Sequence, residues 1–170
     1  MDRKPIDRAR AEQLIRVISE AASKLFLQAG SIPMLMHFPA PHSDQVLVVP
    51  LPTTDGASKD LAAGFMRYAL AEADAEWVVC VTEAWVLKVV TADAAQAIKD
   101  AADGGIADHP QREEILHLQM ETTTLGCISA VREIHRDAAG KPSLGPLVIH
   151  DMDSYEGRFI GLLPNKGRAS

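Results

Sequence analysis

Cysteine is scarce in this sequence: only Cys80 and Cys127 occur among 170 residues. Both stand in apolar stretches typical of β-strands and lie far apart along the chain, as small buried residues do in proteins of a reducing compartment. The sequence therefore does not indicate a disulfide-stabilised scaffold.

Basic clusters and long apolar runs are also missing. The formal net charge is −6 and no run of Lys or Arg offers a local exception, so we expect a nucleic-acid backbone to be repelled. No apolar run reaches the roughly 20 residues needed to cross a bilayer, and the charged N-terminal stretch MDRKPIDRARAEQ lacks the apolar core of a signal peptide. These absences predict a cytoplasmic protein with neither a nucleic-acid nor a membrane partner.

The familiar motifs of catalysis and cofactor binding are absent as well. The sequence contains neither of the glycine-rich phosphate loops GxxxxGK[ST] and GxGxxG, nor the GxSxG nucleophile elbow. Its six histidines are scattered, and none forms the HxxxH or HExxH pair that brings two imidazoles to one zinc ion. We therefore expect no cofactor and no metal, and any catalysis would depend on dispersed residues.

Apolar residues return at helical spacing in two segments. Over residues 7–29 they recur every three or four positions, with Asp7 placed to cap the helix and Gly30 to end it. Between the helices, the runs MLMHF and VLVVPLP flank the turn-forming stretch PAPHSDQ and predict a β-hairpin. The second helix is expected over residues 58–74, with Ser58 as its N-cap and with apolar positions that include Leu61, Phe65, Met66 and Leu70.

Strand patterns dominate the second half of the chain. Residues 76–90 form an apolar strand, so the preceding strand, the second helix and this strand predict a right-handed βαβ unit with two parallel strands. Residues 91–111, an alanine-rich turn and a loop, are expected to leave the sheet. Residues 112–136 alternate at period two around a turn near Thr123, and SLGPLVIHD predicts one further strand.

These elements predict one α+β domain over residues 1–170, whose ends at 1–6 and 165–170 are frayed. The sheet is expected to be mixed and mostly antiparallel, with the two main helices packed largely on one face. In the hairpin after residue 112, three facing pairs keep apolar residues together and oppose unlike charges: Leu118 with Ile128, Leu116 with Ala130, and Glu114 with Arg132.

One acid, Glu83, interrupts the apolar strand VVCVTEAWVLKVV. Both faces of this strand are apolar, as in the interior of a sheet, and Trp77 and Trp85 share the face of Glu83. A carboxylate in such surroundings is expected to pair with a cation or to stay protonated, because burying it alone as an ion is too costly. Arg112 and Arg132 are the candidate partners, because the hairpin that carries them should lie next to this strand.

The segments VTEAW, HPQREEILHLQME, AVREIHRDAAGKPSLGPL and SYEGRF follow one another between Trp77 and Leu163. In this order they resemble a group of uncharacterised bacterial proteins with the pattern EAW, HPxRxE and EGRF. The resemblance implies that this chain shares its fold with these bacterial proteins. It implies no activity, cofactor or site residue.

Two classes of function are compatible with these observations. The lack of a reaction motif, together with apolar residues near the chain end, favours a module that binds another protein or itself, and we expect a homodimer formed through residues 147–150 and 159–163. The alternative is a small acid–base enzyme or anionic-ligand-binding protein. In that case Glu83 and His109 exchange protons, and Arg112 or Arg132, with Trp85, holds the ligand.

Overall fold

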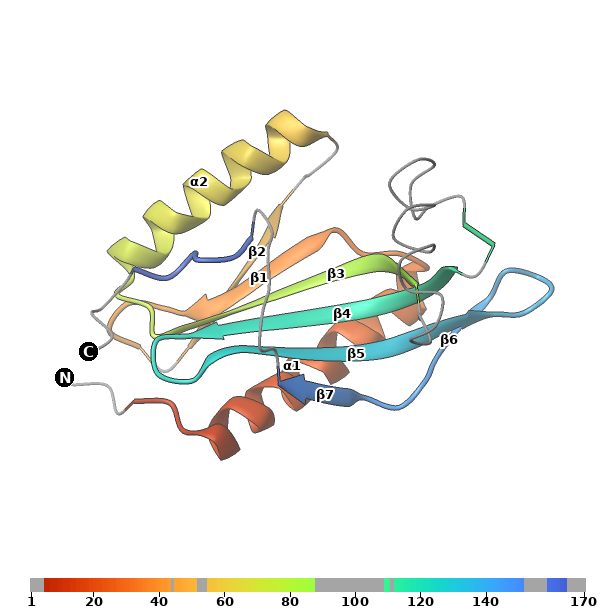
Figure 1. The fold of residues 1–170 in the computed structure, drawn as a ribbon, viewed down its shortest axis with the longest axis horizontal. Coiled ribbons are helices and arrows are strands. Elements are labelled where there is room, and N and C mark those ends of the chain that lie inside the picture. The colour runs from red at the N-terminus through yellow and green to blue at the C-terminus, as the bar shows by residue number, and fades with distance from the viewer. Residues whose placement is uncertain are drawn as a thin grey trace, which may run out of the picture.

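The computed structural model describes residues 5–43, 45–51, 55–87, 109–110, 112–151 and 159–164. In chain order its elements are α1 (Arg8–Ala29), β1 (Met34–Pro39), β2 (Val46–Leu51), α2 (Gly56–Glu72), β3 (Trp77–Leu87), β4 (Arg112–Thr122), β5 (Gly126–Arg136), β6 (Pro142–Leu144) and β7 (Val148–Asp151) (Figure 1). The predicted α+β fold class is confirmed. The excursion expected over residues 91–111 lies outside the described residues except for 109 and 110, as do the ends 1–4 and 165–170.

The first helix begins and ends where the sequence predicts. The Asp7 side chain accepts a hydrogen bond from the Arg10 N–H at 2.9 Å, and Gly30 ends the helix in the left-handed conformation at a φ of 80°. Ile6, expected within a frayed end, is instead buried, and its carbonyl accepts a hydrogen bond from the Thr124 hydroxyl at 3.0 Å. The chain is therefore attached to the β4–β5 turn before α1 begins.

The second helix begins earlier than expected, because Asp55 and not Ser58 is its N-cap. The Asp55 carboxylate accepts a hydrogen bond from the Ser58 N–H at 2.7 Å, and the Ser58 hydroxyl accepts one from the Asp55 N–H at 3.0 Å. The hydrogen bond from the Ser58 backbone is the main cause that lowers the pKa of Asp55. Ser58 lies in the first turn of α2, where its side chain accepts the N-cap N–H and completes a capping box.

The sheet runs in the order β2–β1–β3–β4–β5–β6, with β7 pairing with β5, and every described strand pair is antiparallel. The β1–β2 hairpin is confirmed, with Met34 facing Leu51 and Pro39 facing Val46. The crossover from β2 through α2 to β3 exists, but β1 lies between the two strands. The predicted parallel neighbours are therefore wrong. The reason is that β1, which is buried along most of its length, takes the interior position and leaves the mostly exposed β2 at the edge.

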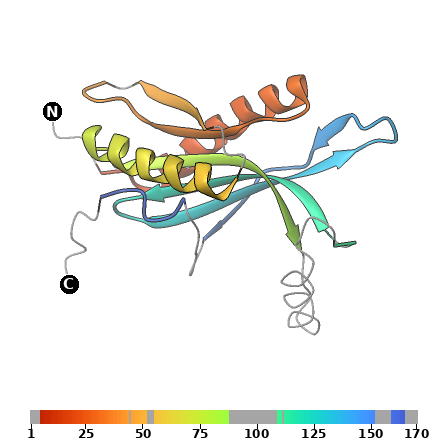
Figure 2. The ribbon, with the colours of Figure 1, turned by 90° about the horizontal axis from the view of Figure 1, so that it is seen from above.

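The two helices lie on opposite faces of the sheet, and the prediction that both pack largely on one face is wrong (Figures 1 and 2). Alternate residues of β3 serve both sides, as expected for an interior strand: Val79 and Val81 pack toward α1, whereas Val78 and Cys80 pack toward α2. Since β3 needs an apolar cover on each face, one helix is used for each.

The long β4–β5 hairpin forms as predicted, but its register differs by two residues. Leu118 faces Ala130 and Leu116 faces Arg132, because the loop comprises residues 123–125 and Gly126 follows it at a φ of 77°. The side chain of Thr122 accepts the Leu125 N–H at 2.8 Å and holds this wider loop. A shift of two residues leaves every side chain on its predicted face, so the apolar pattern does not report it.

The C-terminal leucines are buried within the chain. Leu162 and Leu163 pack with Met66 and Leu70 of α2. Their backbone N–H groups each donate a hydrogen bond at 3.0 Å to the carboxylate of Glu121. The expectation that the chain has too little surface to cover this segment is therefore wrong for Leu162 and Leu163, which α2 and the sheet cover. The expected homodimer stays a prediction.

Candidate functional site

Glu83 is half-buried on the α1 side of β3 and is bound to backbone. Its Oε1 accepts a hydrogen bond of 2.6 Å from the N–H of Ile32, a buried residue in the connection from α1 to β1. Among the described residues no ion pair joins Glu83 to Arg112 or Arg132. The predicted Glu–Arg pair is not formed there, and the acid instead satisfies a backbone donor that no side-chain pattern in the sequence reveals.

Arg132 connects β5 to α1. Its Nε donates to the Ser19 hydroxyl at 2.8 Å, its Nη1 donates to the Gly145 carbonyl at 3.1 Å, and its Nη2 pairs with Glu20. Across the sheet Arg132 and Glu83 both flank Leu116, one on each neighbouring strand. The Arg132 guanidinium thus holds α1 against β5, and this candidate ligand-binding residue has a structural role.

His109 stands just before β4, where its carbonyl accepts the Arg112 N–H at 3.1 Å. The side chain of His109 is half-buried. Neither His109 nor Glu83 lines the groove that surrounds Trp85 and Arg112. The proton exchange predicted between Glu83 and His109 therefore gains no support from the described residues.

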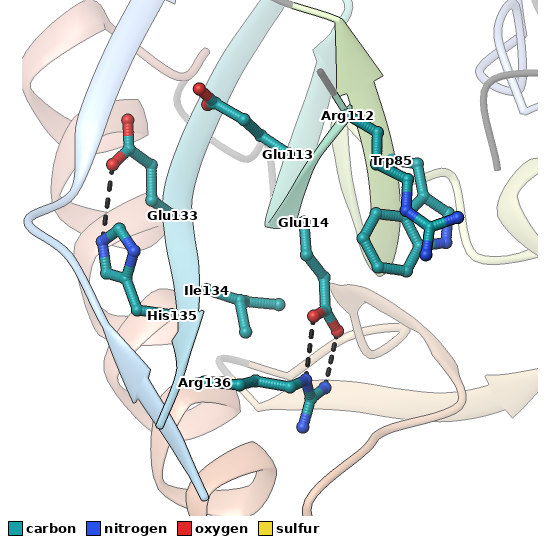
Figure 3. Close-up of a pocket in the computed structure, with 8 residues that line it drawn as sticks. All are labelled: Trp85, Arg112, Glu113, Glu114, Glu133, Ile134, His135 and Arg136. Atoms are coloured by element: carbon teal, nitrogen blue, oxygen red, sulfur yellow. Dashed lines mark hydrogen bonds and ion pairs between the residues drawn. The ribbon is translucent and has the colours of Figure 1, made fainter. Parts of the chain in front are cut away.

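An open groove of about 340 Å³ lies where the end of β3, the start of β4 and the end of β5 come together (Figure 3). The Arg112 guanidinium lies over the Trp85 indole, 4.3 Å from the ring centroid, which is a cation–π contact. The side chain of Ile134 points into the space beside them (Figure 3). Two candidates from the sequence are thus brought together, with these described residues around them: Trp85, Arg112, Glu113, Glu114, Glu133, Ile134, His135 and Arg136.

Most charged side chains in the groove are paired with one another. Arg136 grips Glu114 with two hydrogen bonds of 2.9 and 2.5 Å, and these bonds raise the pKa of Arg136. His135 Nε2 lies 3.5 Å from the Glu133 carboxylate. The Glu114–Arg136 pair was missed from the sequence because the predicted register placed Glu114 opposite Arg132. Chemically, the groove offers an aromatic face and charges of both signs, with three carboxylates and two guanidinium groups among its lining residues.

Three described residues with nucleophilic or basic side chains, Cys80, His117 and Ser129, are held in unreactive states. Burial raises the pKa of the Cys80 thiol to about 12, so that the thiolate is not formed at neutral pH. His117 Nε2 lies 2.9 Å from the Ser129 hydroxyl, and burial lowers the pKa of this histidine. Ser129 is itself buried in mid-strand, where a substrate cannot approach it. This pair satisfies two polar groups inside the sheet.

The outer side of α2 carries three large apolar side chains in contact with solvent. Leu61, Phe65 and Tyr68 are 77%, 55% and 66% exposed. They follow one another at spacings of four and three, so they form one stripe opposite the buried face of the helix, which contains Ala63, Met66 and Leu70. In Figure 1, α2 lies at the periphery of the molecule. We call these three residues the outer stripe of α2.

Comparison of the chain with protein-family models, curated proteins and solved structures yields no match. Neither described helix has an apolar stretch of the length that crossing a membrane requires. Within the part of the chain that the structure describes, histidine, cysteine and acidic side chains form no group of three suited to a metal ion. The groove and the outer stripe are therefore the two described surfaces that suggest a function.

Proposed function

We propose that this chain is a protein-interaction module that binds through the outer stripe of α2. The observation that supports the proposal is the exposure of Leu61, Phe65 and Tyr68 on one side of a single helix. Each such side chain gains about 1.5–3 kcal/mol when it is fully buried. A helix offering apolar residues at i, i+4 and i+7 also has the pattern by which amphipathic helices dock. Both cysteines are buried and neither forms a disulfide, which supports a reducing, cytoplasmic location as part of this proposal.

The outer stripe is not part of the core, so substitutions in it should affect binding and leave stability unchanged. In the variant Leu61→Gln/Phe65→Gln, helix propensity is nearly kept because glutamine is a good helix former. We expect its thermal midpoint to equal that of the wild type, whereas Met66→Gln, on the buried face of α2, should unfold the protein.

Association is tested by a photo-crosslinking amino acid placed at Phe65 in cells, with the exposed α1 position Lys24 as the control. We expect a discrete adduct from position 65 that disappears when Leu61→Gln is added. The mass of the adduct identifies the partner class: twice the 18.4 kDa of the chain for a second copy, and another discrete mass for another protein. The lack of any discrete adduct from position 65 would contradict the proposal.

A second candidate is binding of an anion at Arg112. Its support is that no described carboxylate forms an ion pair with Arg112, whose guanidinium rests on Trp85. Trp85 is 41% exposed and Trp77 is 7% exposed, so quenching by a ligand reports mainly Trp85. Titration with inorganic phosphate should change the fluorescence of the wild type and not that of Arg112→Gln. Identical titration curves for the two proteins rule this candidate out.

A further inference from the structure

One edge of the sheet is formed by β2. In the strand order it has β1 on one side and no described strand on the other. Its side chains Val46, Leu47 and Val48 are 40%, 40% and 51% exposed, and the strand VLVVPL contains no charged residue. An open edge presents unpaired backbone N–H and C=O groups to which another strand can bond. The edge at β2 is therefore open in its backbone and apolar in its side chains.

The hydrogen bonds of the β1–β2 hairpin show which backbone groups of β2 point outward. The Ala40 N–H donates to the Gln45 C=O at 2.8 Å, so these two residues form a hydrogen-bonded pair. In an antiparallel ladder such pairs alternate with pairs whose backbone groups point away from each other. Continuing the register places three residues of β2 in pairs of the second kind: Val46, Val48 and Pro50.

Pro50 limits the length of this free edge. Because proline has no N–H and this position faces the open side, the ladder available to a new strand ends there. The free edge thus offers the N–H and C=O of Val46 and Val48, followed by the C=O of Pro50 alone. It spans about 14 Å, at about 3.4 Å per residue. This length suits one short segment in extended conformation.

The strands on the far side of the sheet are protected in ways that β2 is not. There β6 has only three residues and begins with Pro142, and β7 has only four. At the end of β7, Asp151 pairs with Arg8 of α1. Short strands, proline and charged side chains are the usual means by which proteins keep a sheet edge from pairing. The first half of β2 has none of them, because its one proline lies near its end.

We infer that β2 binds an extended, proline-free segment of another protein, which adds to the sheet as a further strand. The main chain of the segment bonds to Val46 and Val48. Its side chains are apolar, because they lie beside Val48 on one face of the sheet and beside Leu47 on the other. A folded second copy fits less well, since this short edge alone offers it far less than the roughly 1,200 Å² that a stable interface buries. The site is separate from the outer stripe of α2, so the inference goes beyond the proposed function.

Selection of peptides by the purified protein tests this site. The probe is a display library of random heptapeptides, offered to the wild type and to Val48→Pro. This variant loses one outward N–H and keeps the bonds to β1, as the native Pro50 does at the next outward position. We expect the wild type to enrich proline-free peptides rich in Val and Ile, and Val48→Pro to bind them about tenfold more weakly. Val48→Thr keeps the N–H and the β-branched shape, and as the matched control it should bind like the wild type.

N-methylation of an enriched peptide gives a readout that does not depend on the folding of any variant. In an added strand every second N–H faces β2, and the N–H groups between them face away. Methylation of a facing N–H should weaken binding about tenfold, whereas methylation of an intervening one should change it less than about threefold. The affinity should therefore alternate along the peptide.

The inference is overturned if no peptide is enriched, or if the wild type and Val48→Pro bind the enriched peptides equally. It is also overturned if N-methylation has the same effect at every position, because the binding would then not involve a backbone ladder. Loss of a wild-type dimer in Val48→Pro, with no peptide enriched, would make a second copy the occupant of β2. The adduct from position 65 is measured separately, so its absence would contradict the proposed function and leave this inference in place.

Discussion

Replacement of Glu83 tests whether this acid serves the fold through the backbone or through a charge partner. Glu83→Ala removes the acceptor of the Ile32 N–H, a bond of 2.6 Å. Leaving a buried donor unsatisfied costs about 1–3 kcal/mol, and because Glu83 is only half-buried, water recovers part of the bond and the lower half of this range applies. Glu83→Gln keeps an oxygen acceptor in the same place and loses only the charge assistance, so it should cost about half as much.

Thermal and urea unfolding of the two variants measure this difference. For a chain of this size, 1 kcal/mol shifts the melting temperature by about 2–4 °C. Glu72→Gln, an exposed acid at the end of α2, is the control for loss of one negative charge and should leave stability unchanged. A Gln variant as unstable as the Ala variant would show that the charge of Glu83, and not its hydrogen bond, matters. A Gln variant more stable than the wild type would indicate an acid kept for ligand binding at the expense of stability.

Three further predictions concern groups whose pKa the fold shifts. Burial lowers the pKa of His37 and His117 below the usual value of 6.5. As the pH falls through 6.5, only the unfolded chain therefore takes up protons at these two histidines. The free energy of unfolding should be constant above pH 6.5 and decline below it, by up to about 1.4 kcal/mol per pH unit for each histidine. Urea unfolding at neutral and mildly acidic pH measures the slope, which His37→Gln/His117→Gln should flatten, and equal stability at both pH values contradicts the assignment. Asp55→Ala should lower the melting temperature because it removes the α2 cap, whereas Asp55→Ser should not; an unchanged Ala variant would refute the capping role. The Cys80 thiol, with its pKa at about 12, should resist thiol reagents in the folded protein and react only in urea, and rapid native labelling at Cys80 would show that it is accessible.

The fold was largely predictable where the pattern depends on local spacing. Helix spacing and the Asp7 and Gly30 signals placed α1, and period two placed the β4–β5 hairpin. Strand order was not predictable, because a run of apolar residues does not show which edge of β1 receives β3. Side-chain periodicity likewise cannot detect a two-residue change of register, which keeps each residue on its face.

The candidate site was predicted only in part. Trp85 and Arg112 do meet, because they occupy neighbouring strands at one end of the sheet. Glu83 does not join them, since its partner is a backbone N–H that has no sequence signature. The outer stripe was visible in principle: Leu61 and Phe65 lie on the side of the helix opposite Met66 and Leu70. A helix that is apolar on two sides signals a second contact surface.

The most direct test of whether the outer stripe of α2 joins two copies of this chain in the expected homodimer is sedimentation equilibrium of the wild type and of Leu61→Gln/Phe65→Gln up to high micromolar concentration. A contact made mainly by one helix from each chain is small, so we expect a weak dimer whose population depends on concentration. The wild-type mass should rise from 18.4 kDa toward twice that value, while the variant should stay at 18.4 kDa. A mass of 18.4 kDa for both proteins at every concentration would contradict the homodimer expected for this chain.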